Sequence, residues 1–209
     1  GFRPMDAHAL EESLAQLSKT HDRPYLLQVC LHSHPTIDSM GNAGLATLRV
    51  MTVRSRSKGE ARMMLAVLRI PVGDSAAGID AGDIAAPVDL KSGECSQGVQ
   101  NLGEFPLRLH DTHPESGAQI RGSVLPFWEE TTDLCLRAHN LLNTQMPLIG
   151  WDVAILPGGP TFLEANRFPG GNLAQMPSGL GLGATPFAEC VLAELRDAFL
   201  RASSKSGRI

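Results

Sequence analysis

Apolar and polar residues follow one another along this chain in two patterns, one typical of helices and one typical of strands. Apolar residues recur at helical spacing over residues 7–18, 127–143 and 186–202, and each of these segments predicts a helix. Apolar runs of strand length cover residues 25–31, 46–54 and 61–71. A polar turn sequence separates the last two runs, which predicts an antiparallel hairpin.

Two more hairpins are predicted further along, over residues 84–99 and within residues 150–170. Residues 167–185, before the last helix, are Gly-rich and predict a loop. Hairpins therefore dominate, with helices between them. This order predicts an α+β fold with a mainly antiparallel sheet and packed helices. The 209 residues, of which 43% are hydrophobic, suffice for a sizeable core.

Charge and cysteine usage argue against several function classes. The net charge of −4 argues against a broad nucleic-acid or membrane-surface footprint. Since no run of about 18 apolar residues occurs, we expect no membrane span. The four cysteines lie far apart and form no CxxC pair, which argues against a zinc ribbon or a thioredoxin-type site. Reduced, mostly buried thiols are typical of a cytosolic protein, so we expect a cytoplasmic location.

One predicted hairpin carries polar residues that its apolar strands do not need. Its sequence is GWDVAILPGGPTFLEANRFPG, with Asp152 on the first strand and Glu164 and Asn166 on the second. Glu164 and Asn166 share a face, because side chains two apart in a strand point the same way. An even loop would place Asp152 opposite Ala165, on the wrong face. An odd loop or a bulge would place Asp152 opposite Asn166 and Ala154 opposite Glu164, so that the three oxygen-bearing side chains converge.

Such a convergence would suit a divalent cation. Asp, Glu and Asn supply hard oxygen ligands, which Mg²⁺ prefers, and Mg²⁺ usually keeps waters and substrate phosphates as further ligands. Two neighbouring carboxylates on an apolar sheet repel each other, and a dication offsets this cost. The pattern therefore indicates a phosphoryl-transfer site. The alternative is an exposed hairpin with ordinary polar residues on its solvent face.

The same hairpin resembles the closing metal-binding hairpin of the ATP-grasp superfamily. That motif has an Asp at the start of one strand, Glu-x-Asn on the next, and Pro-Gly shortly after. More closely, the chain is similar to the sugar-transfer associated ATP-grasp proteins. Further segments carry this resemblance, in family order over most of residues 24–178: YLLQVCLHSHP, ATLRVMTV, LRIPVG, GDIAAPVDLKSG and HPESGAQIRGSVLPFWEE. The resemblance implies the C-terminal lobe of an ATP-grasp fold.

The resemblance also implies roles for individual residues, with ATP and Mg²⁺ as cofactors. It implies Asp152, Glu164 and Asn166 as magnesium ligands. The segment expected to contact the adenine ring through its backbone consists of Gln28, Val29, Cys30 and Leu31. Arg49, and less strongly Arg69, match an arginine that faces a phosphate or an acyl phosphate. Gln28 has the alternative of satisfying a sheet edge, and Arg49 has the alternative of an ion pair within its apolar strand.

The resemblance further implies a domain organisation. We expect residues 1–23 to be a helix left from a preceding lobe, residues 24–201 to be the C-terminal lobe, and residues 202–209 to be a flexible tail. The preceding lobe normally supplies a phosphate-binding lysine, so we expect association with a missing N-terminal lobe or with a second copy. The chain departs from the family pattern in Ala46, where Asn is usual, and in the placement of Asp80 and Asp83.

Two functions are therefore expected as alternatives. The first is an ATP- and Mg-dependent ligase that activates a carboxylate as an acyl phosphate for attack by an amine or similar nucleophile, in polysaccharide or cell-envelope metabolism. Its partners would be small-molecule carboxylate and amine substrates. The second is a catalytically incomplete ATP-grasp lobe that acts as a nucleotide-binding or scaffold domain.

Overall fold

The computed structural model describes residues 6–21, 28–41, 44–54, 59–73, 82–103, 105–142 and 146–206. Its contacts divide the chain into two compact units, Gly1–Leu31 and His32–Ile209, and each is described by itself. The predicted domain boundary between residues 23 and 24 lies outside the described residues.

The first unit contains helix α1, Ala7–His21, which confirms the helix predicted over residues 7–18 and extends it. Asp6 begins it as an N-cap, because its Oδ1 accepts a hydrogen bond from the Ala9 amide at 2.8 Å. The strand predicted over residues 25–31 is wrong for residues 28–31, which form no strand. Its first part, residues 25–27, lies outside the described residues. An apolar run alone therefore did not specify a strand here.

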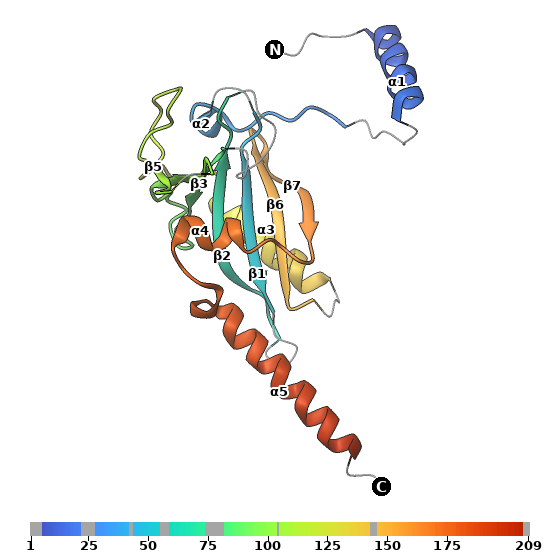
Figure 1. The fold of residues 1–209 in the computed structure, drawn as a ribbon, viewed down its shortest axis with the longest axis vertical. Coiled ribbons are helices and arrows are strands. Elements are labelled where there is room, and N and C mark those ends of the chain that lie inside the picture. Colours follow the sequence, from blue (N-terminus) through green and yellow to red (C-terminus); the bar gives the residue numbers. More distant parts are fainter. Residues whose placement is uncertain are drawn as a thin grey trace. The chain divides into compact units, whose positions relative to one another are not determined.

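In the second unit, the strands of the described residues form one sheet in which all neighbours are antiparallel, in the order β5-β4-β3-β2-β1-β6-β7 (Figure 1). The strands are β1 Thr47–Val53, β2 Arg62–Ile70, β3 Ile84–Pro87, β4 Gly98–Gln100, β5 Arg108–His110, β6 Leu148–Leu156 and β7 Gly159–Asn166. The three predicted hairpins are β1–β2, β3–β4 and β6–β7, so the predicted α+β class and antiparallel sheet are confirmed. The hairpin β6–β7 joins the sheet beside β1, which brings the first strand along the chain next to the last but one.

Helices cover both faces of this sheet. They are α2 Pro35–Asp38, α3 Trp128–Leu141, α4 Asn172–Ser178 and α5 Pro186–Ser206, with a 3₁₀ turn, η2, at Leu182–Ala184. Figure 1 shows α4 in front of the strands and α3 behind them. On the α3 face, Leu48, Val50 and Trp151 are buried in the main core. On the α4 face, Val67 and Ala85 pack under Leu173 of α4.

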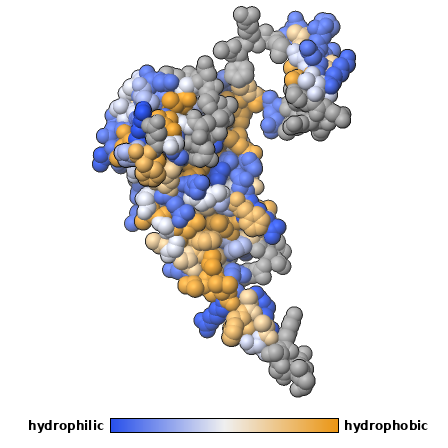
Figure 2. Space-filling model, in the orientation of Figure 1, coloured by the Kyte–Doolittle hydropathy of each residue, from blue (hydrophilic) through white to orange (hydrophobic). Residues whose placement is uncertain are grey.

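Two parts of the C-terminal segment differ from the prediction. Residues 167–185 were predicted as a loop, but α4 forms there because Leu173 and Met176 pack on the sheet. Helix α5 continues to Ser206 rather than ending at residue 202, so it includes part of the predicted tail. It contacts the sheet near Phe187 and Cys190. Further along, apolar side chains are exposed (Figure 2), namely Leu192, Leu195, Phe199 and Leu200.

None of the described helices is long and apolar enough to cross a membrane.

A buried chain of hydrogen bonds links β1, α3 and β6 on the α3 face. Trp151 Nε1 donates to Thr52 Oγ1 at 2.8 Å. The Thr52 hydroxyl lies 2.7 Å from His139 Nδ1, and His139 Nε2 lies 3.1 Å from the Met146 carbonyl oxygen. Because that carbonyl only accepts, Nε2 carries the proton and Thr52 donates to Nδ1. Every donor and acceptor in this hydrogen-bond chain has a partner only when His139 is neutral. Burial lowers the pKa of His139 from its ordinary value of 6.5, an effect that Arg54 reinforces and the Met146 bond opposes.

Acidification is expected to lower the melting temperature because of His139. The unfolded side chain takes up a proton near pH 6.5, but the folded one does so only at lower pH. The stabilising contribution is therefore complete above about pH 6.5 and is lost as the pH falls through the folded pKa. Circular dichroism melts at about pH 7.5 and about pH 5.5 measure the drop. His139→Gln should be less stable at the higher pH and lose less on acidification.

His110 provides the control: its pKa is also lowered, by burial and then by Arg108, but it is only partly buried and lies outside this hydrogen-bond chain. His110→Gln should keep most of the wild-type drop in melting temperature. A drop in His139→Gln as large as that of the wild type would contradict the assignment to His139.

Candidate functional site

The β6–β7 hairpin contains the bulge that the sequence predicts. Leu156 pairs with Gly159 across a two-residue turn, and Val153 pairs with Phe162. The register then shifts by one residue at Leu163, so that Asp152 pairs with Glu164. Directly paired side chains share a face of an antiparallel sheet, so the carboxylates converge as predicted. The predicted partners, however, are wrong: Asn166 pairs with Gly150, and Thr161 pairs with Ala154.

Arg49 extends this pair into a row across three neighbouring strands. Asp152 pairs with Arg49 of β1 on one side and with Glu164 of β7 on the other. We call Arg49, Asp152 and Glu164 the carboxylate row; it lies on the α4 face. One edge of the guanidinium binds both oxygens of the Asp152 carboxylate: Nε donates to Oδ1 and Nη2 donates to Oδ2, the latter at 3.0 Å. The side chains of Arg49 and Asp152 are only 14% and 20% exposed, so the pair is well shielded from water.

Asn166 and Gly150 form the next pair on the same face, two residues along their strands from Glu164 and Asp152. Asn166 Nδ2 donates to Asp152 Oδ2 at 3.4 Å. A Cβ atom at Gly150 would lie 2.5 Å from Pro169 Cβ and 3.5 Å from Arg49 Cδ. Gly150 therefore lets Pro169 pack directly over β6 beside Arg49. The sequence had indicated Pro169-Gly170 only as part of a motif, and the contact between Gly150 and Pro169 gives that proline a structural reason.

Arg69 lies on the same face as the row, diagonally across from Arg49. Arg69 of β2 pairs with Thr47, and Arg49 pairs with Val67, so their Cα atoms are roughly 7–8 Å apart. Arg69 Nε lies 3.6 Å from Oδ2 of Asp83, whose side chain is 3% exposed. Sequence reasoning missed Asp83 as a site residue. Its signal was present: like Asp152, it is a single carboxylate at the head of a short apolar run.

A comparison with known protein families matches residues 6–187 to the family described as sugar-transfer associated ATP-grasp. The chain belongs to the sugar-transfer associated ATP-grasp family. This confirms the resemblance, and the match contains the whole carboxylate row together with Arg69, Asp83 and Asn166. No curated protein and no solved structure matches the chain.

The segment predicted to contact adenine in this ATP-grasp protein lies in the first unit. Gln28, Val29 and Cys30 are exposed, with Val29 at 83%. Gln28, Val29, Cys30 and Leu31 form no strand, and the alternative interpretation of Gln28 as satisfying a sheet edge stays a prediction. The adenine-contacting role of these four residues stays a prediction.

The oxygen donors of the carboxylate row and of Asn166 fit a magnesium ion. Asp152, Glu164 and Asn166 lie on one face, and Glu164 is exposed. Asp152 Oδ1 accepts one guanidinium N–H and keeps a second lone pair, whereas Oδ2 accepts from both Arg49 and Asn166. Among the described residues, no group of three or more His, Cys, Asp or Glu side chains is placed to hold a metal. The fit therefore depends on Asn166 as the third donor, through its amide oxygen.

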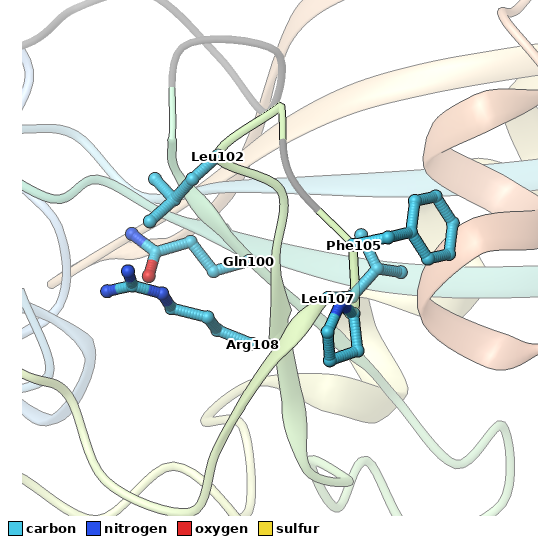
Figure 3. A pocket seen from close by; sticks show the side chains of 6 residues that line it. Gln100, Leu102, Phe105, Leu107 and Arg108 are labelled. Atoms are coloured by element: carbon cyan, nitrogen blue, oxygen red, sulfur yellow. The ribbon is translucent and has the colours of Figure 1, made fainter.

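A cavity of about 310 Å³ lies at the other end of the sheet order and is separate from the row. It is lined by Gln100, Leu102, Phe105, Pro106, Leu107 and Arg108. Figure 3 shows Gln100 and Arg108 side by side on β4 and β5. The Gln100 amide is already paired, with the Gly82 carbonyl and with His110. This cavity adds no residue to the ATP-grasp site.

Proposed function

We propose that this ATP-grasp protein is an ATP- and Mg-dependent ligase that activates a carboxylate as an acyl phosphate for attack by an amine or similar nucleophile. One observation supports the proposal above the others. The carboxylate row and Asn166 gather two carboxylates, a carboxamide and a guanidinium on one face of the sheet, within the family match. Phosphoryl transfer needs such a combination of cation ligands and fixed positive charge.

In this proposal each side chain has a stated task. Asp152, Glu164 and Asn166 hold Mg²⁺, which when bound neutralises charge on the phosphates. Arg49 balances the charge of Asp152 and lies beside it to face the transferring phosphoryl group. Pro169, packed on Gly150, shields the neighbouring side of the site from water. Gln28, Val29, Cys30 and Leu31 keep their predicted role at the adenine ring.

The remaining functional predictions belong to the same proposal. The carboxylate and amine substrates, the setting in polysaccharide or cell-envelope metabolism, the cytoplasmic location and the association with another lobe or copy all stay predictions. They follow from the family resemblance and composition, and the row itself does not select among substrates.

Calorimetric titration with Mg-ATP tests the proposal. The wild type is expected to bind, and Asn166→Ala is expected to bind about tenfold more weakly, since it loses one oxygen ligand and one hydrogen bond. Asn172→Ala is the matched control, because Asn172 is an exposed asparagine at the start of α4. It should bind like the wild type. Chelation of Mg²⁺ should reduce wild-type affinity to that of Asn166→Ala or below.

Failure to bind in all three proteins would contradict the proposal. Binding without ATP turnover, in the presence of candidate acids and amines, would instead favour the alternative of a nucleotide-binding or scaffold lobe.

A further inference from the structure

The Arg69–Asp83 pair contains two buried polar atoms without a partner. Arg69 Nε and Asp83 Oδ1 are both buried, and neither has a hydrogen-bond partner within the described structure. Their ion pair is loose, with 3.6 Å between Nε and Oδ2. Buried charges normally have full hydrogen-bonding complements, so an incompletely paired arginine and aspartate beside a candidate site call for an explanation.

Arg69 differs from Arg49 in the hydrogen bonds that its guanidinium makes. Arg49 donates from Nε and Nη2 to the two oxygens of Asp152, and its side chain is 14% exposed. Arg69 makes no hydrogen bond that the described residues account for, and its side chain is 31% exposed. Arg69 therefore keeps its N–H donors for a ligand, whereas Arg49 already spends two of its five on Asp152.

Asp83 lies where it can fix the direction of Arg69. It directly precedes β3, and Arg69 pairs with Ala85 two residues further on, so Asp83 lies diagonally across from Arg69 on the α4 face. The nitrogen nearest to Asp83 is the buried Nε, at the inner end of the guanidinium. A carboxylate behind Nε leaves the two terminal nitrogens to point outward as a planar fork, the arrangement that matches an oxyanion.

We propose that Asp83 is a positioning residue that holds Arg69 in place to bind an oxyanion, either a phosphoryl group or a carboxylate, on the α4 face. The inference rests on the proposed function for the identity of the ligand, but it assigns Asp83, which that function did not use. It also gives Arg69 a task beside that of Arg49: Arg49 balances Asp152 and faces the transferring phosphoryl group, and Arg69 binds an oxyanion through its remaining N–H donors.

Arg and Lys carry the same charge, which makes positioning separable from simple electrostatics. Neutralising Asp83 alone raises the local positive potential and by itself favours anions. That effect is the same whether position 69 holds Arg or Lys. Only the geometry of the fork differs between the two, so a double-mutant cycle of Arg69→Lys and Asp83→Asn isolates the positioning effect.

The cycle is measured by calorimetry with inorganic tripolyphosphate in one arm and succinate in the other. With Asp83 intact, Arg69→Lys is expected to weaken binding of the recognised anion about tenfold. In the Asp83→Asn background the same change should cost about twofold or less. The arm that shows this coupling identifies the anion as phosphoryl or carboxylate.

Two further sets of variants keep the test decisive. Asp83→Glu retains the charge but moves the carboxylate by one methylene, and it should weaken binding even if Asp83→Asn folds poorly. Arg62→Lys with Glu189→Gln repeats the cycle on an exposed pair between Arg62 of β2 and Glu189 of α5, with 3.2 Å between Nη2 and Oε2, and should show no coupling.

Equal losses in both backgrounds, or no binding of either anion by the wild type, would overturn the inference. Coupling in the cycle without Mg-dependent ATP binding would instead sink the proposed function and leave the role of Asp83 standing. Mg-dependent ATP binding with no coupling would do the reverse.

Discussion

Arg49→Gln is expected to strengthen the binding of Mn²⁺, used as a probe for Mg²⁺, by about tenfold in the absence of nucleotide. In the structure the guanidinium occupies both oxygens of Asp152. A metal must therefore compete with a built-in cation. Two unit charges 4 Å apart interact by about 4 kcal/mol at an effective dielectric constant of about 20. Salt and water reduce this repulsion between Arg49 and the metal, and the tenfold change expected corresponds to about 1.4 kcal/mol of it.

Electron paramagnetic resonance of free Mn²⁺ measures this affinity directly. Arg62→Gln is the matched control, because Arg62 also pairs with a carboxylate, Glu189, but lies exposed away from the row. It should leave Mn²⁺ binding unchanged. Circular dichroism checks that Arg49→Gln folds with its Asp152 charge unpaired, and added Mn²⁺ should raise its melting temperature more than that of the wild type. Weaker or unchanged Mn²⁺ binding in Arg49→Gln would argue against a metal at Asp152.

Thr52→Val is expected to lower the free energy of unfolding by about 2–4 kcal/mol. The substitution keeps the shape of the side chain but removes the hydroxyl between Trp151 and His139. Trp151 Nε1 and His139 Nδ1 then remain buried without a partner, at about 1–2 kcal/mol each, in the lower part of the usual range for a neutral group. Thr52 and His139 are fully buried and Trp151 is 3% exposed, so water does not readily replace the lost bonds.

Urea unfolding of Thr52→Val and Thr52→Ser separates the hydroxyl from the packing. Thr52→Ser keeps the hydroxyl and loses a methyl group, so it should retain most of the stability that Thr52→Val loses. If serine proved as destabilising as valine, packing rather than the hydrogen-bond chain would explain the effect. Since Trp151 and Asp152 point to opposite faces, neither variant should change the arrangement of the carboxylate row.

Local patterns were sufficient to predict the hairpins and the bulge. The alternation of apolar and polar residues around Asp152, Glu164 and Asn166, with a Pro-Gly cluster between, required an irregular register for the three to share a face, and β6–β7 has that irregularity. The partners were assigned wrongly because the predicted turn was too wide. Gly159 and Pro160 belong to β7, so the turn closes earlier and moves Glu164 opposite Asp152.

Contacts between distant segments could not be predicted in the same way. Arg49 and Asp152 meet because β6 pairs with β1, and nothing in either strand specifies that neighbour. The sequence left Arg49 with a paired or a functional role, and the structure gives it a partner. Asp83 was missed for the same reason, since its contact with Arg69 depends on β3 pairing with β2. Helix α4 was missed because Gly and Pro surround a helical signal of only a few apolar residues.

Leu163 has a consequence for how this hairpin tolerates changes in length. It is the unpaired residue between Phe162 and Glu164, and it is 40% exposed. Without it the ladder would become regular and Asp152 would still oppose Glu164, whereas a deletion between Glu164 and Asn166 would put these two side chains on opposite faces. A change of length in β7 is therefore neutral to the site when it leaves Asp152 opposite Glu164 and keeps Glu164 and Asn166 two residues apart, and Leu163 is the position that the hairpin can spare.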